Sequence, residues 1–369
     1  MKRFRIGILF GGRSGEHEVS LRSAASVMDV IDQEKYEIIP IGITKEGKWL
    51  AGGDPLRALQ EGDIPGENSW AAFVTDPQYP GIICYDSLTQ GKISFQRLDL
   101  IFPVLHGPFG EDGTVQGLLE MAGIPYVGSG VLGSAAAMDK VIMKKLFAQN
   151  DIPIGEYLYF NRRRWEREQQ EIISCIEKKL HYPCFIKPAN LGSSVGVSKA
   201  ADRDELLAGI GDAFRYDCKI IVEKFIAGRE IECSVLGNET PSASLPGEII
   251  PCNDFYDYRA KYIDDRSELV IPAPLSEKLT RHVQELAKRS FSAVEASGLA
   301  RVDFFIDDNE QVFLNEINTM PGFTNISMYP KLWEATGLPY RELIDRLIEL
   351  ALERHQQRAQ LLTSPPAFD

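Results

Sequence analysis

The spacing of apolar residues in the first third of the chain predicts an α/β domain. Arg5 to Phe10 and Leu98 to Leu105 are almost continuously apolar, which is typical of strands buried on both faces of a parallel sheet. Tyr36 to Ile43 predicts another strand, and Ser20 to Ile31 predicts a helix. Strands that alternate with helices favour an α/β fold. A Gly- and Pro-rich insertion between Gly47 and Gly91 interrupts the pattern.

The remaining chain predicts mixed α+β regions. We expect a helix from Met138 to Asn150, and strands between Tyr157 and Phe225 that surround one charged helix, Glu166 to Leu180. These changes of pattern divide the chain into three predicted domains, at residues 1–139, 140–227 and 228–369.

Two amphipathic helices are predicted in the third domain. Ser276 is the candidate N-cap of the first and Gly298 its candidate stop, while Pro339 lies near the start of the second. The core-facing sides of these helices carry Leu279, Val283, Leu286, Ala287, Ser290 and Val294 in the first, and Leu343, Ile344, Leu347, Ile348 and Ala351 in the second. We interpret both sides as core, with no part in chemistry.

A predicted β-hairpin in the third domain gathers polar side chains on one face. Its strands run from Ala300 to Ile306 and from Gln311 to Asn318, and the polar turn Asp307-Asp308-Asn309 joins them. Strand side chains alternate between faces with period two. One face of the hairpin therefore carries Arg301, Asp303, Glu316 and Asn318.

The same hairpin predicts a magnesium site. Folding it about Asn309 brings Asp303 opposite Glu316. Oxygen ligands without sulfur or imidazole suit Mg²⁺, which often binds substrate phosphates through one or two carboxylates. The alternative is a surface hairpin with solvated acids, but Glu316 and Asn318 lie inside an otherwise apolar strand. We therefore expect phosphoryl chemistry on a nucleotide.

Composition narrows the class of protein. The chain has 369 residues, 44% of them hydrophobic and 25% charged, as in ordinary globular proteins. Its net charge of −13 disfavours nucleic acid and anionic membranes as partners, and favours small-molecule substrates. No apolar run has the length of a membrane helix, and the first residues lack a cleavable apolar region. The six cysteines show no CxxC spacing, so we expect reduced thiols and a cytoplasmic protein.

Two glycine-rich segments compete as phosphate-binding loops. Gly128 to Gly133 matches GxGxxG, the pattern of a dinucleotide fold, but the strand before it is very short and the motif closes a domain instead of opening one. Lys187 to Gly196 instead offers a lysine on a strand, followed by a Gly- and Ser-rich loop with unobstructed backbone N–H groups. Without the GK[ST] ending it is no Walker loop, and we interpret it as a lid over a triphosphate. The alternative is an ordinary hairpin turn.

Six sequence blocks, taken together and in this order, resemble the D-alanine–D-alanine ligase family of the ATP-grasp superfamily over essentially the whole chain. The blocks are Gly11 to Ser20, His106 to Gly113, Met138 to Lys140, Lys187 to Gly196, Phe255 to Tyr262 and Asn315 to Gly322. The resemblance implies a three-domain ATP-grasp architecture: an N-terminal substrate-binding domain with a parallel sheet, a central subdomain with a phosphate-covering loop, and a C-terminal subdomain with an omega-type loop and the magnesium site.

The resemblance also implies the reaction and its cofactors. ATP and two Mg²⁺ ions, for which Mn²⁺ can substitute, would drive the joining of two D-alanine molecules through an acyl phosphate, with ADP and phosphate as products, for peptidoglycan synthesis. We expect ATP and D-alanine as the small-molecule partners, and a homodimer.

The residues that this resemblance assigns to ATP and metal lie in the second and third domains. Lys140, Lys187 and Ser194 would hold the phosphates, and Lys261 would approach the transferred group. Adenine and ribose would be held by Glu223, Lys224, Ile226 and Glu230. Asp303, Glu316 and Asn318 would bind the metal.

The residues assigned to the amino acids come from all three domains. Glu16 would pair with the ammonium of the first D-alanine, Ser193 and Tyr262 would hydrogen-bond with it, and His106 would line the subsite. Arg301 and the Gly322 N–H would receive the oxyanion, and Ser327 with the Met328 N–H the second carboxylate. Without the family, Glu16 could be an acid at a helix start, and Tyr262 an aromatic residue of a surface loop.

Alternatives of substrate and class stay open from the sequence. D-serine or D-lactate could replace the second D-alanine, although Lys261, Tyr262 and Met328 favour an amine as acceptor in this family. An NAD-dependent oxidoreductase would use the Gly128 loop. A nucleotide-binding protein without catalysis is the third alternative, disfavoured because the phosphate- and metal-facing residues are all present.

Overall fold

The computed structural model describes residues 3–62, 70–86, 91–192, 194–250 and 268–362. An N-terminal sheet with the strand order β3-β2-β1-β7 begins the fold. Its strands are β1 (Phe4–Gly11), β2 (Tyr36–Ile43), β3 (Trp49–Ala51) and β7 (Leu100–Val104). β1 pairs in parallel with β2 and β7, while β3 pairs antiparallel with β2. This pairing confirms the predicted parallel sheet. Both faces of β1 and β7 are buried, as their apolar sequences predicted.

The insertion after β3 has its own structure, which its composition did not predict. It contains helix α2 (Pro55–Glu61) and the antiparallel strands β4 (Trp70–Val74), β5 (Gly81–Asp86) and β6 (Lys92–Arg97). These strands form a separate sheet in the order β4-β5-β6. Ala71, Ile82 and Cys84 pack with residues of the N-terminal sheet. The insertion therefore extends the N-terminal core.

Four further helices belong to the first part of the chain or join it to the next. They are α1 (His17–Val30), α3 (Thr114–Met121), α4 (Val131–Met138) and α5 (Lys140–Gln149). The helix predicted from Met138 to Asn150 is present as α5, and the structure has a further helix, α4, that ends at Met138. Asp139 separates them: its extended backbone ends α4, and its carboxylate accepts N–H groups of Val141 and Ile142 as the N-cap of α5.

The central sheet is antiparallel and has the order β10-β9-β11-β8. Its elements are β8 (Tyr157–Asn161), α6 (Arg162–Lys179), β9 (Cys184–Pro188), β10 (Ser198–Ala200), α7 (Arg203–Ala213) and β11 (Lys219–Lys224). The sequence predicted one helix here, but both α6 and α7 contribute buried residues to one core with this sheet. Asp202 starts α7 by accepting the Glu205 N–H.

The C-terminal sheet has the order β15-β14-β12-β16-β17, with β13 beside β12. Its strands are β12 (Arg229–Gly237), β13 (Ser242–Ala243), β14 (Gly247–Ile250), β15 (Glu268–Val270), β16 (Gly298–Ile306) and β17 (Val312–Asn318). The helices are α9 (Glu277–Ala293), α10 (Met328–Ala335) and α11 (Tyr340–Ala359). Ser276 caps α9 as predicted, but α9 ends at Ala293, before Gly298.

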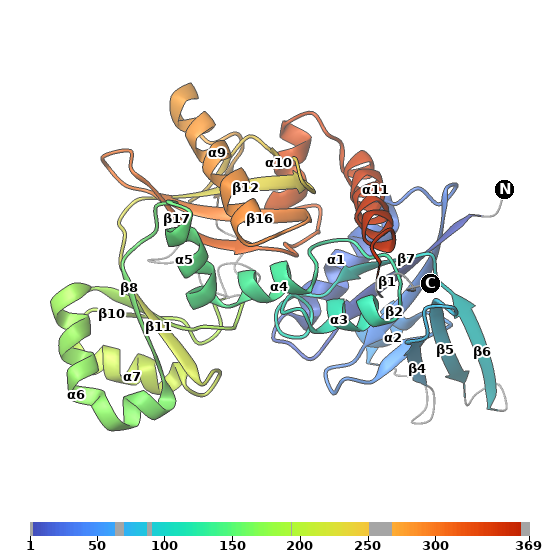
Figure 1. Cartoon of the computed structure of the whole chain (residues 1–369), viewed down its shortest axis with the longest axis horizontal. Helices are drawn as coiled ribbons and strands as arrows, with labels where there is room; N and C mark the ends of the chain where they lie inside the picture. The colour runs from blue at the N-terminus through green and yellow to red at the C-terminus, as the bar shows by residue number, and fades with distance from the viewer. Residues whose placement is uncertain (1–2, 63–69, 87–90, 193, 251–267, 363–369) are drawn as a thin grey trace, which may run out of the picture.

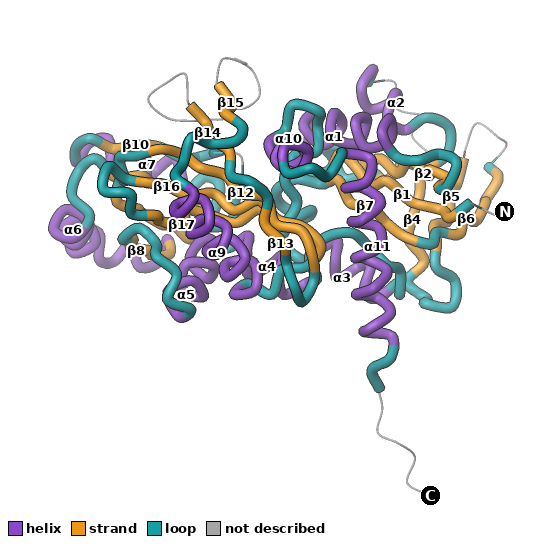
Figure 2. The backbone as a smooth tube through the Cα atoms, turned by 90° about the horizontal axis from the view of Figure 1, so that it is seen from above, coloured by secondary structure: helices purple, strands orange, loops and turns teal. Residues whose placement is uncertain are grey.

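The C-terminal sheet lies between the central sheet and the N-terminal sheets along the molecule (Figure 1). The central sheet with α6 and α7 lies at one end and the N-terminal sheets at the other. Helix α11 returns to the N-terminal sheet, as Figure 2 shows from above, and Leu343, Leu347 and Ile348 share one core with β1 and α1. No helix in the described part of the chain is both long and apolar enough to cross a bilayer. The boundaries at residues 140 and 228 stay a prediction.

Candidate functional site

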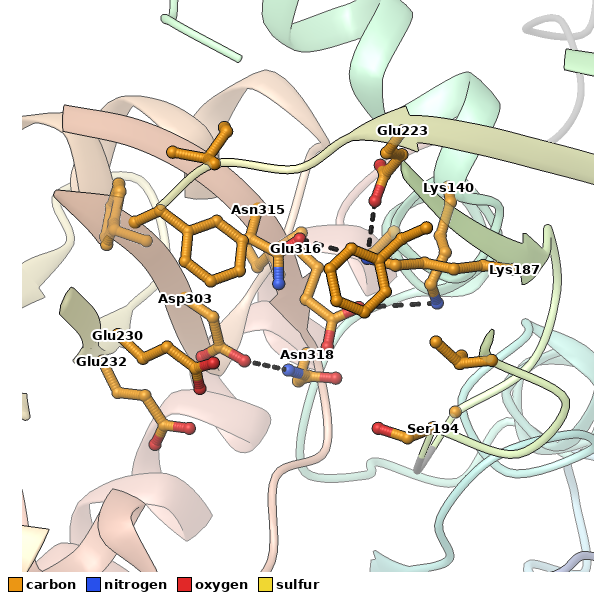
Figure 3. Close-up of a pocket in the computed structure, with 18 of the residues that line it drawn as sticks. Lys140, Lys187, Ser194, Glu223, Glu230, Glu232, Asp303, Asn315, Glu316 and Asn318 are labelled. Carbon is orange, nitrogen blue, oxygen red and sulfur yellow. Dashed lines mark hydrogen bonds and ion pairs between the residues drawn. The ribbon is translucent and has the colours of Figure 1, made fainter. Parts of the chain in front are cut away.

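A cavity of about 250 Å³ lies where the central and C-terminal sheets face each other. Strands β9 and β11 contribute Lys187 and Glu223, and β16 and β17 contribute Asp303 and Glu316. In Figure 3 the lysines approach from one side and the acids of β12, β16 and β17 from the other. Two antiparallel sheets thus bring oppositely charged side chains together around one space.

The hairpin of β16 and β17 carries the predicted metal ligands on its cavity face. Asp303 is opposite Glu316, as the period-two pattern predicted, and Arg301 is opposite Asn318. The register shifts between Asp303 and Phe304, so that β17 has one extra residue, Asn315, on the turn side of Glu316. Because of this bulge, Asn315 also lines the cavity.

Carboxylates from three neighbouring strands lie in one row across the sheet. Glu232 of β12 is opposite Asp303, which is opposite Glu316. Arg301 lies one step along the same face: its Nε and Nη2 donate to Asp303 at 2.8 and 2.7 Å, and Nε lies 3.1 Å from Glu232. Burial opposes its charge, but Asp303 and Glu232 hold the pKa of Arg301 well above its usual range. The guanidinium therefore stays charged beside the acids.

The donor set of this face fits Mg²⁺. Among the described residues no three His, Cys, Asp or Glu side chains form a closed metal cluster. Two carboxylates and an amide, with open positions for water and phosphate oxygens, are the arrangement that Mg²⁺ commonly takes at nucleotide sites. Asn318 Nδ2 donates to Asp303 at 3.1 Å, and half a turn of the amide would present its oxygen to a metal.

Two lysines face these acids from the other side of the cavity. Lys140, at the start of α5, lies 3.5 Å from Glu316 and donates to the Leu191 carbonyl at 2.9 Å. Lys187 lies 2.5 Å from Glu223 and 3.5 Å from the Asn315 amide oxygen. Burial opposes the charge of Lys187, but the neighbouring acids Glu223 and Glu316 raise its pKa. Both cations are thus held at the cavity wall.

Glu223 has a buried cation on each of its two oxygens. Lys144 Nζ lies 2.8 Å from Oε1 and Lys187 Nζ 2.5 Å from Oε2. Burial opposes ionisation, but the two ammonium groups lower the pKa of Glu223 to about 2. Lys144 also donates to the Asn315 carbonyl at 3.3 Å, so it joins both sheets at the cavity floor.

The remaining residues predicted to hold adenine and ribose also line the cavity. Lys224, Ile226 and Glu230 line it, together with the aromatic residues Phe185, Phe225 and Phe305. Lys224 directs its ammonium to Glu156 at the surface, 3.1 Å away. The three phenylalanines offer apolar walls to a planar base, while Glu230 lies beside Glu232 and Asp303 (Figure 3).

The glycine-rich loop lies over Glu16. Gly192 and Ser194 line the cavity, and Ser194 has a left-handed backbone, with φ of 57°. A Cβ placed on Gly192 would lie 2.8 Å from Glu16 Oε2, so a larger residue here would require the Glu16 side chain to move. Glu16 itself is buried. The loop thus connects the phosphate end of the cavity to the predicted ammonium subsite.

The residues predicted for the oxyanion and the second carboxylate lie close together. A Cβ on Gly322 would lie 2.9 Å from Ser327 Oγ, which accepts the Thr324 N–H at 3.1 Å. Met328 begins α10, so its N–H is at the positive end of a helix. The Met328 side chain packs with Ile249 and Leu332 and leaves only its backbone for a ligand.

His106 lies between the N-terminal sheet and the loop after β17. Its Nδ1 is 2.9 Å from the Met320 carbonyl and its Nε2 is 3.2 Å from Ser23 Oγ. Burial lowers the pKa of His106 and outweighs the opposing effect of Glu16. A neutral imidazole at this position supports the subsite by its hydrogen bonds. The three remaining predicted residues, Ser193, Lys261 and Tyr262, lie outside the described part of the chain.

Sequence reasoning did not single out Lys144, Asn315, Glu232 and Glu111. A signal existed for all four, since Asn315 belongs to the Asn315 to Gly322 block. Lys144 lies four residues after Lys140 on the same helix side, Glu232 shares a strand face with Glu230, and Glu111 belongs to the His106 to Gly113 block. The position of Asn315 at the cavity required the bulge, which alternation alone does not predict.

The competing Gly128 to Gly133 segment serves close packing between the N-terminal and C-terminal parts of the chain. A Cβ on Gly133 would lie 2.5 Å from the Glu295 carbonyl, and one on Gly298 would lie 3.2 Å from the Gly128 backbone nitrogen. These glycines allow backbones to approach, and the segment does not open onto the cavity. The geometry gives no support to a dinucleotide loop here.

Known proteins resemble this chain along almost its whole length. Two family models match it, the D-ala D-ala ligase N-terminus at residues 5–129 and the D-ala D-ala ligase C-terminus at residues 146–349. The D-alanine–D-alanine ligase of Natranaerobius thermophilus is 55% identical over 359 residues, 97% of each chain. The enzyme of the same name from Heliobacterium modesticaldum is 52% identical over 365 residues, 98% of each chain.

Solved structures agree with the sequence relatives. The D-alanine–D-alanine ligase of Coxiella burnetii has a TM-score of 0.83 and 38% identity, covering 98% of this chain and 97% of its own. The VanG D-Ala:D-Ser ligase of Enterococcus faecalis has a TM-score of 0.84 and 36% identity, covering 95% of this chain and 100% of its own. With the predicted ATP-grasp fold and the charged cavity between its sheets, the chain belongs to the D-alanine–D-alanine ligase family.

Proposed function

We propose that this protein joins two D-alanine molecules at the expense of ATP, which it cleaves to ADP and phosphate. The observation that carries this proposal is the charged cavity, where Asp303 and Glu316 face Lys140 and Lys187. Phosphoryl transfer needs mainly positioning and neutralisation of charge. The family membership supplies the substrates, since the named relatives are D-alanine–D-alanine ligases.

In the first step, a carboxylate oxygen of the first D-alanine attacks the γ-phosphorus, the bond to the ADP oxygen breaks, and an acyl phosphate forms. Lys140 and Lys187 hold the phosphate oxygens, with Ser194 of the glycine-rich loop above them. Asp303, Glu316 and Asn318 would hold two Mg²⁺ ions, which neutralise the β- and γ-phosphate oxygens when bound. Glu16 pairs with the substrate ammonium and orients the carboxylate toward the nucleotide.

In the second step, the amine of the second D-alanine attacks the acyl carbon, loses a proton, and displaces inorganic phosphate. Arg301 and the Gly322 N–H receive the negative charge that develops on the carbonyl oxygen. One donor of this kind is worth about 2.7–4 kcal/mol in measured oxyanion holes. Ser327 Oγ and the Met328 N–H bind the carboxylate of the second D-alanine, helped by the positive end of α10. Ser193, Lys261 and Tyr262 complete the proposed set.

D-serine as the acceptor is the second candidate. The observation in its favour is the similarity to the D-Ala:D-Ser ligase of Enterococcus faecalis, whose chain is covered completely. Met328, which lies in the apolar cluster with Ile249 and Leu332, favours D-alanine over D-lactate in this family. Initial rates with D-alanine, D-serine and D-lactate as acceptors separate the three.

We also propose that the protein is a homodimer of the cytoplasm. The negative net charge favours small, soluble partners over nucleic acid or membranes. Sedimentation equilibrium of the full chain measures the assembly, and a monomer at micromolar concentration would contradict it.

An isotope experiment tests the reaction directly. D-alanine labelled with ¹⁸O in its carboxylate is mixed with ATP, Mg²⁺ and the protein, and ADP, phosphate and dipeptide are measured together. The three products should form in equal amounts, and the phosphate should carry one labelled oxygen from the substrate. Label in AMP would show an adenylate route and overturn the proposed mechanism.

A further inference from the structure

The loop that follows β17 is held by side chains from the N-terminal part of the chain. This loop runs from Thr319 to Phe323 and contains Gly322, the proposed oxyanion donor. Met320 N–H donates to Glu111 Oε1 at 3.2 Å, and Met320 C=O lies 2.9 Å from His106 Nδ1. Phe323 N–H donates to Ser23 Oγ at 3.2 Å. Three backbone groups of the loop are thus bound from a distant part of the sequence.

The hydrogen bonds among these residues fix one arrangement of protons. Ser23 Oγ accepts the Phe323 N–H, so its own proton is available for His106 Nε2, 3.2 Å away. Nδ1 then carries the imidazole proton and donates it to the Met320 carbonyl. Each hydrogen bond in the series that links Phe323, Ser23, His106 and Met320 therefore has one donor and one acceptor.

Glu111 completes the support on the other side of Met320. Its Oε2 accepts the Gly107 N–H at 2.5 Å, while Oε1 accepts the Met320 N–H. Ser23, His106, Glu111 and Met320 are all at least nine-tenths buried. Buried hydrogen bonds of this kind are costly to break, because water cannot replace a lost partner. The loop is consequently fixed in position relative to His106.

The support leaves the Gly322 N–H available for a ligand. Met320 and Phe323 donate to side chains, and Pro321 has no N–H. Within the part of the chain that the structure describes, no hydrogen bond of the Gly322 N–H is found. Gly322 is half-buried, so its N–H can reach a substrate oxygen.

We infer that Ser23, His106 and Glu111 form a positioning clamp that presets the Gly322 N–H as an oxyanion donor. This inference rests on the proposed function. The clamp also reaches the first amino-acid subsite, because Ser14 Oγ donates to the His106 carbonyl at 2.8 Å and accepts the Glu16 N–H at 3.1 Å. The subsite for the first D-alanine and the donor for its carbonyl oxygen are therefore built on the same residue.

Ser23→Ala tests the clamp, with Ser20→Ala as its matched control. Ser20 lies on the same helix and is equally buried, but its hydroxyl binds Gly11 and Val104, away from the loop. We expect Ser23→Ala to lower kcat roughly tenfold to hundredfold, because small displacements of a catalytic group have effects of this size. The KM for ATP should stay within about twofold, since neither Ser23 nor His106 lines the nucleotide cavity. Ser20→Ala should lower Tm to a similar degree while keeping kcat.

Amide hydrogen exchange of the loop gives a readout that needs no substrate. The Met320 and Phe323 amides should exchange faster in Ser23→Ala than in Ser20→Ala. Unchanged exchange, or an equal loss of kcat in the Ser20 control, would overturn the clamp. Glu111→Gln is the second variant, because its amide nitrogen cannot accept the second N–H, and it should again speed exchange at Met320. A wild-type protein that formed no dipeptide would overturn the proposed function instead, while the exchange data would still decide whether the clamp exists.

Discussion

Two buried carboxylates on opposite sides of the site are stabilised in different ways. Glu223, at the floor of the nucleotide cavity, faces the ammonium groups of Lys144 and Lys187, which lower its pKa to about 2 despite burial. Glu111, beneath the loop after β17, accepts backbone N–H groups of Gly107 and Met320. Burial and the charge of nearby Glu16 raise its pKa.

The difference follows from what each side has to bind. A polyphosphate needs fixed positive charges, and the acids around Lys187 keep that lysine charged although it is buried. On the proposed amino-acid side, Glu111 is held by backbone N–H dipoles and not by cations. Glu223 is therefore compensated by formal charges, and Glu111 by oriented backbone groups.

The largest expected effect comes from the metal face of the nucleotide side. Glu316→Ala should reduce turnover about a thousandfold or more, since metal-ion stabilisation of phosphoryl transfer is worth several kcal/mol. Glu316 is only half-buried, so the fold should be retained. The measurement is ADP release at saturating ATP and D-alanine, with circular dichroism as the check of folding.

Glu310→Ala is the matched control for that variant. It changes an exposed glutamate in the same hairpin, at the turn. Wild-type turnover is expected for it. Full activity of Glu316→Ala would refute the metal assignment.

Next in size is the loss of charge at the cavity floor. Glu223→Gln should lower the free energy of unfolding at neutral pH by about 3 kcal/mol, because two buried ammonium groups lose their partner. Urea denaturation measures this. Glu156→Gln, in the exposed pair with Lys224, serves as the control and should cost less than about 1 kcal/mol. If both variants lowered the free energy of unfolding equally, the buried ion pairs of Glu223 would be no more stabilising than the exposed pair of Glu156.

The two carboxylates should also give opposite dependences on pH. The pKa of Glu223 is lowered, so its contribution is present above about pH 4.5 and is lost as the pH falls toward about 2. The stability gap between wild type and Glu223→Gln should therefore close in acid. The pKa of Glu111 is raised, so wild type should lose stability relative to Glu111→Gln as the pH rises above about 4.5. The difference in stability between wild type and each variant is measured against pH. If the difference changed in the same direction for Glu223→Gln and Glu111→Gln, the two carboxylates would not have opposite pKa shifts.

The smallest effect is expected from Lys144. Lys144→Met should cost about 1–2 kcal/mol of unfolding free energy, because Glu223 keeps Lys187 as a partner and methionine fills most of the space. Lys145→Met is the control on the same helix, where the side chain is exposed and contacts Tyr159. A cost for Lys144→Met as large as that for Glu223→Gln would mean that Lys144 alone holds the carboxylate.

The hairpin shows how far the sequence could predict the site. Alternation correctly placed Asp303 opposite Glu316 and put Arg301 and Asn318 on the same face, because one face of these strands is buried and the other lines the cavity. The same reasoning could not find Asn315, since a bulge depends on the backbone of both strands. The positions of Glu16 and Gly192 required the tertiary fold, which brings residues distant in sequence within contact.

Local signals failed where tertiary packing decides the structure. Helix α7 contains Gly209 and Gly211, which disfavour a helix in isolation, yet Leu206 and Ile210 bury against the central sheet. The insertion after Gly47 has many Gly and Pro residues, but its strands pair with each other and pack on the N-terminal core. Its short, weakly patterned strands gave no period to detect.

The extra residue in β17 has a consequence for changes in chain length. Between Phe304 and the turn the ladder is regular, and beyond Glu316 it is regular again, so Asn315 is surplus to the pairing. A shortened hairpin that lacks this one position could still carry Glu316 opposite Asp303, but it would lose the carbonyl and amide that Lys144 and Lys187 contact. Deletion of Asn315 alone should therefore keep the proposed metal ligands in place and remove the contacts that hold Lys144 and Lys187.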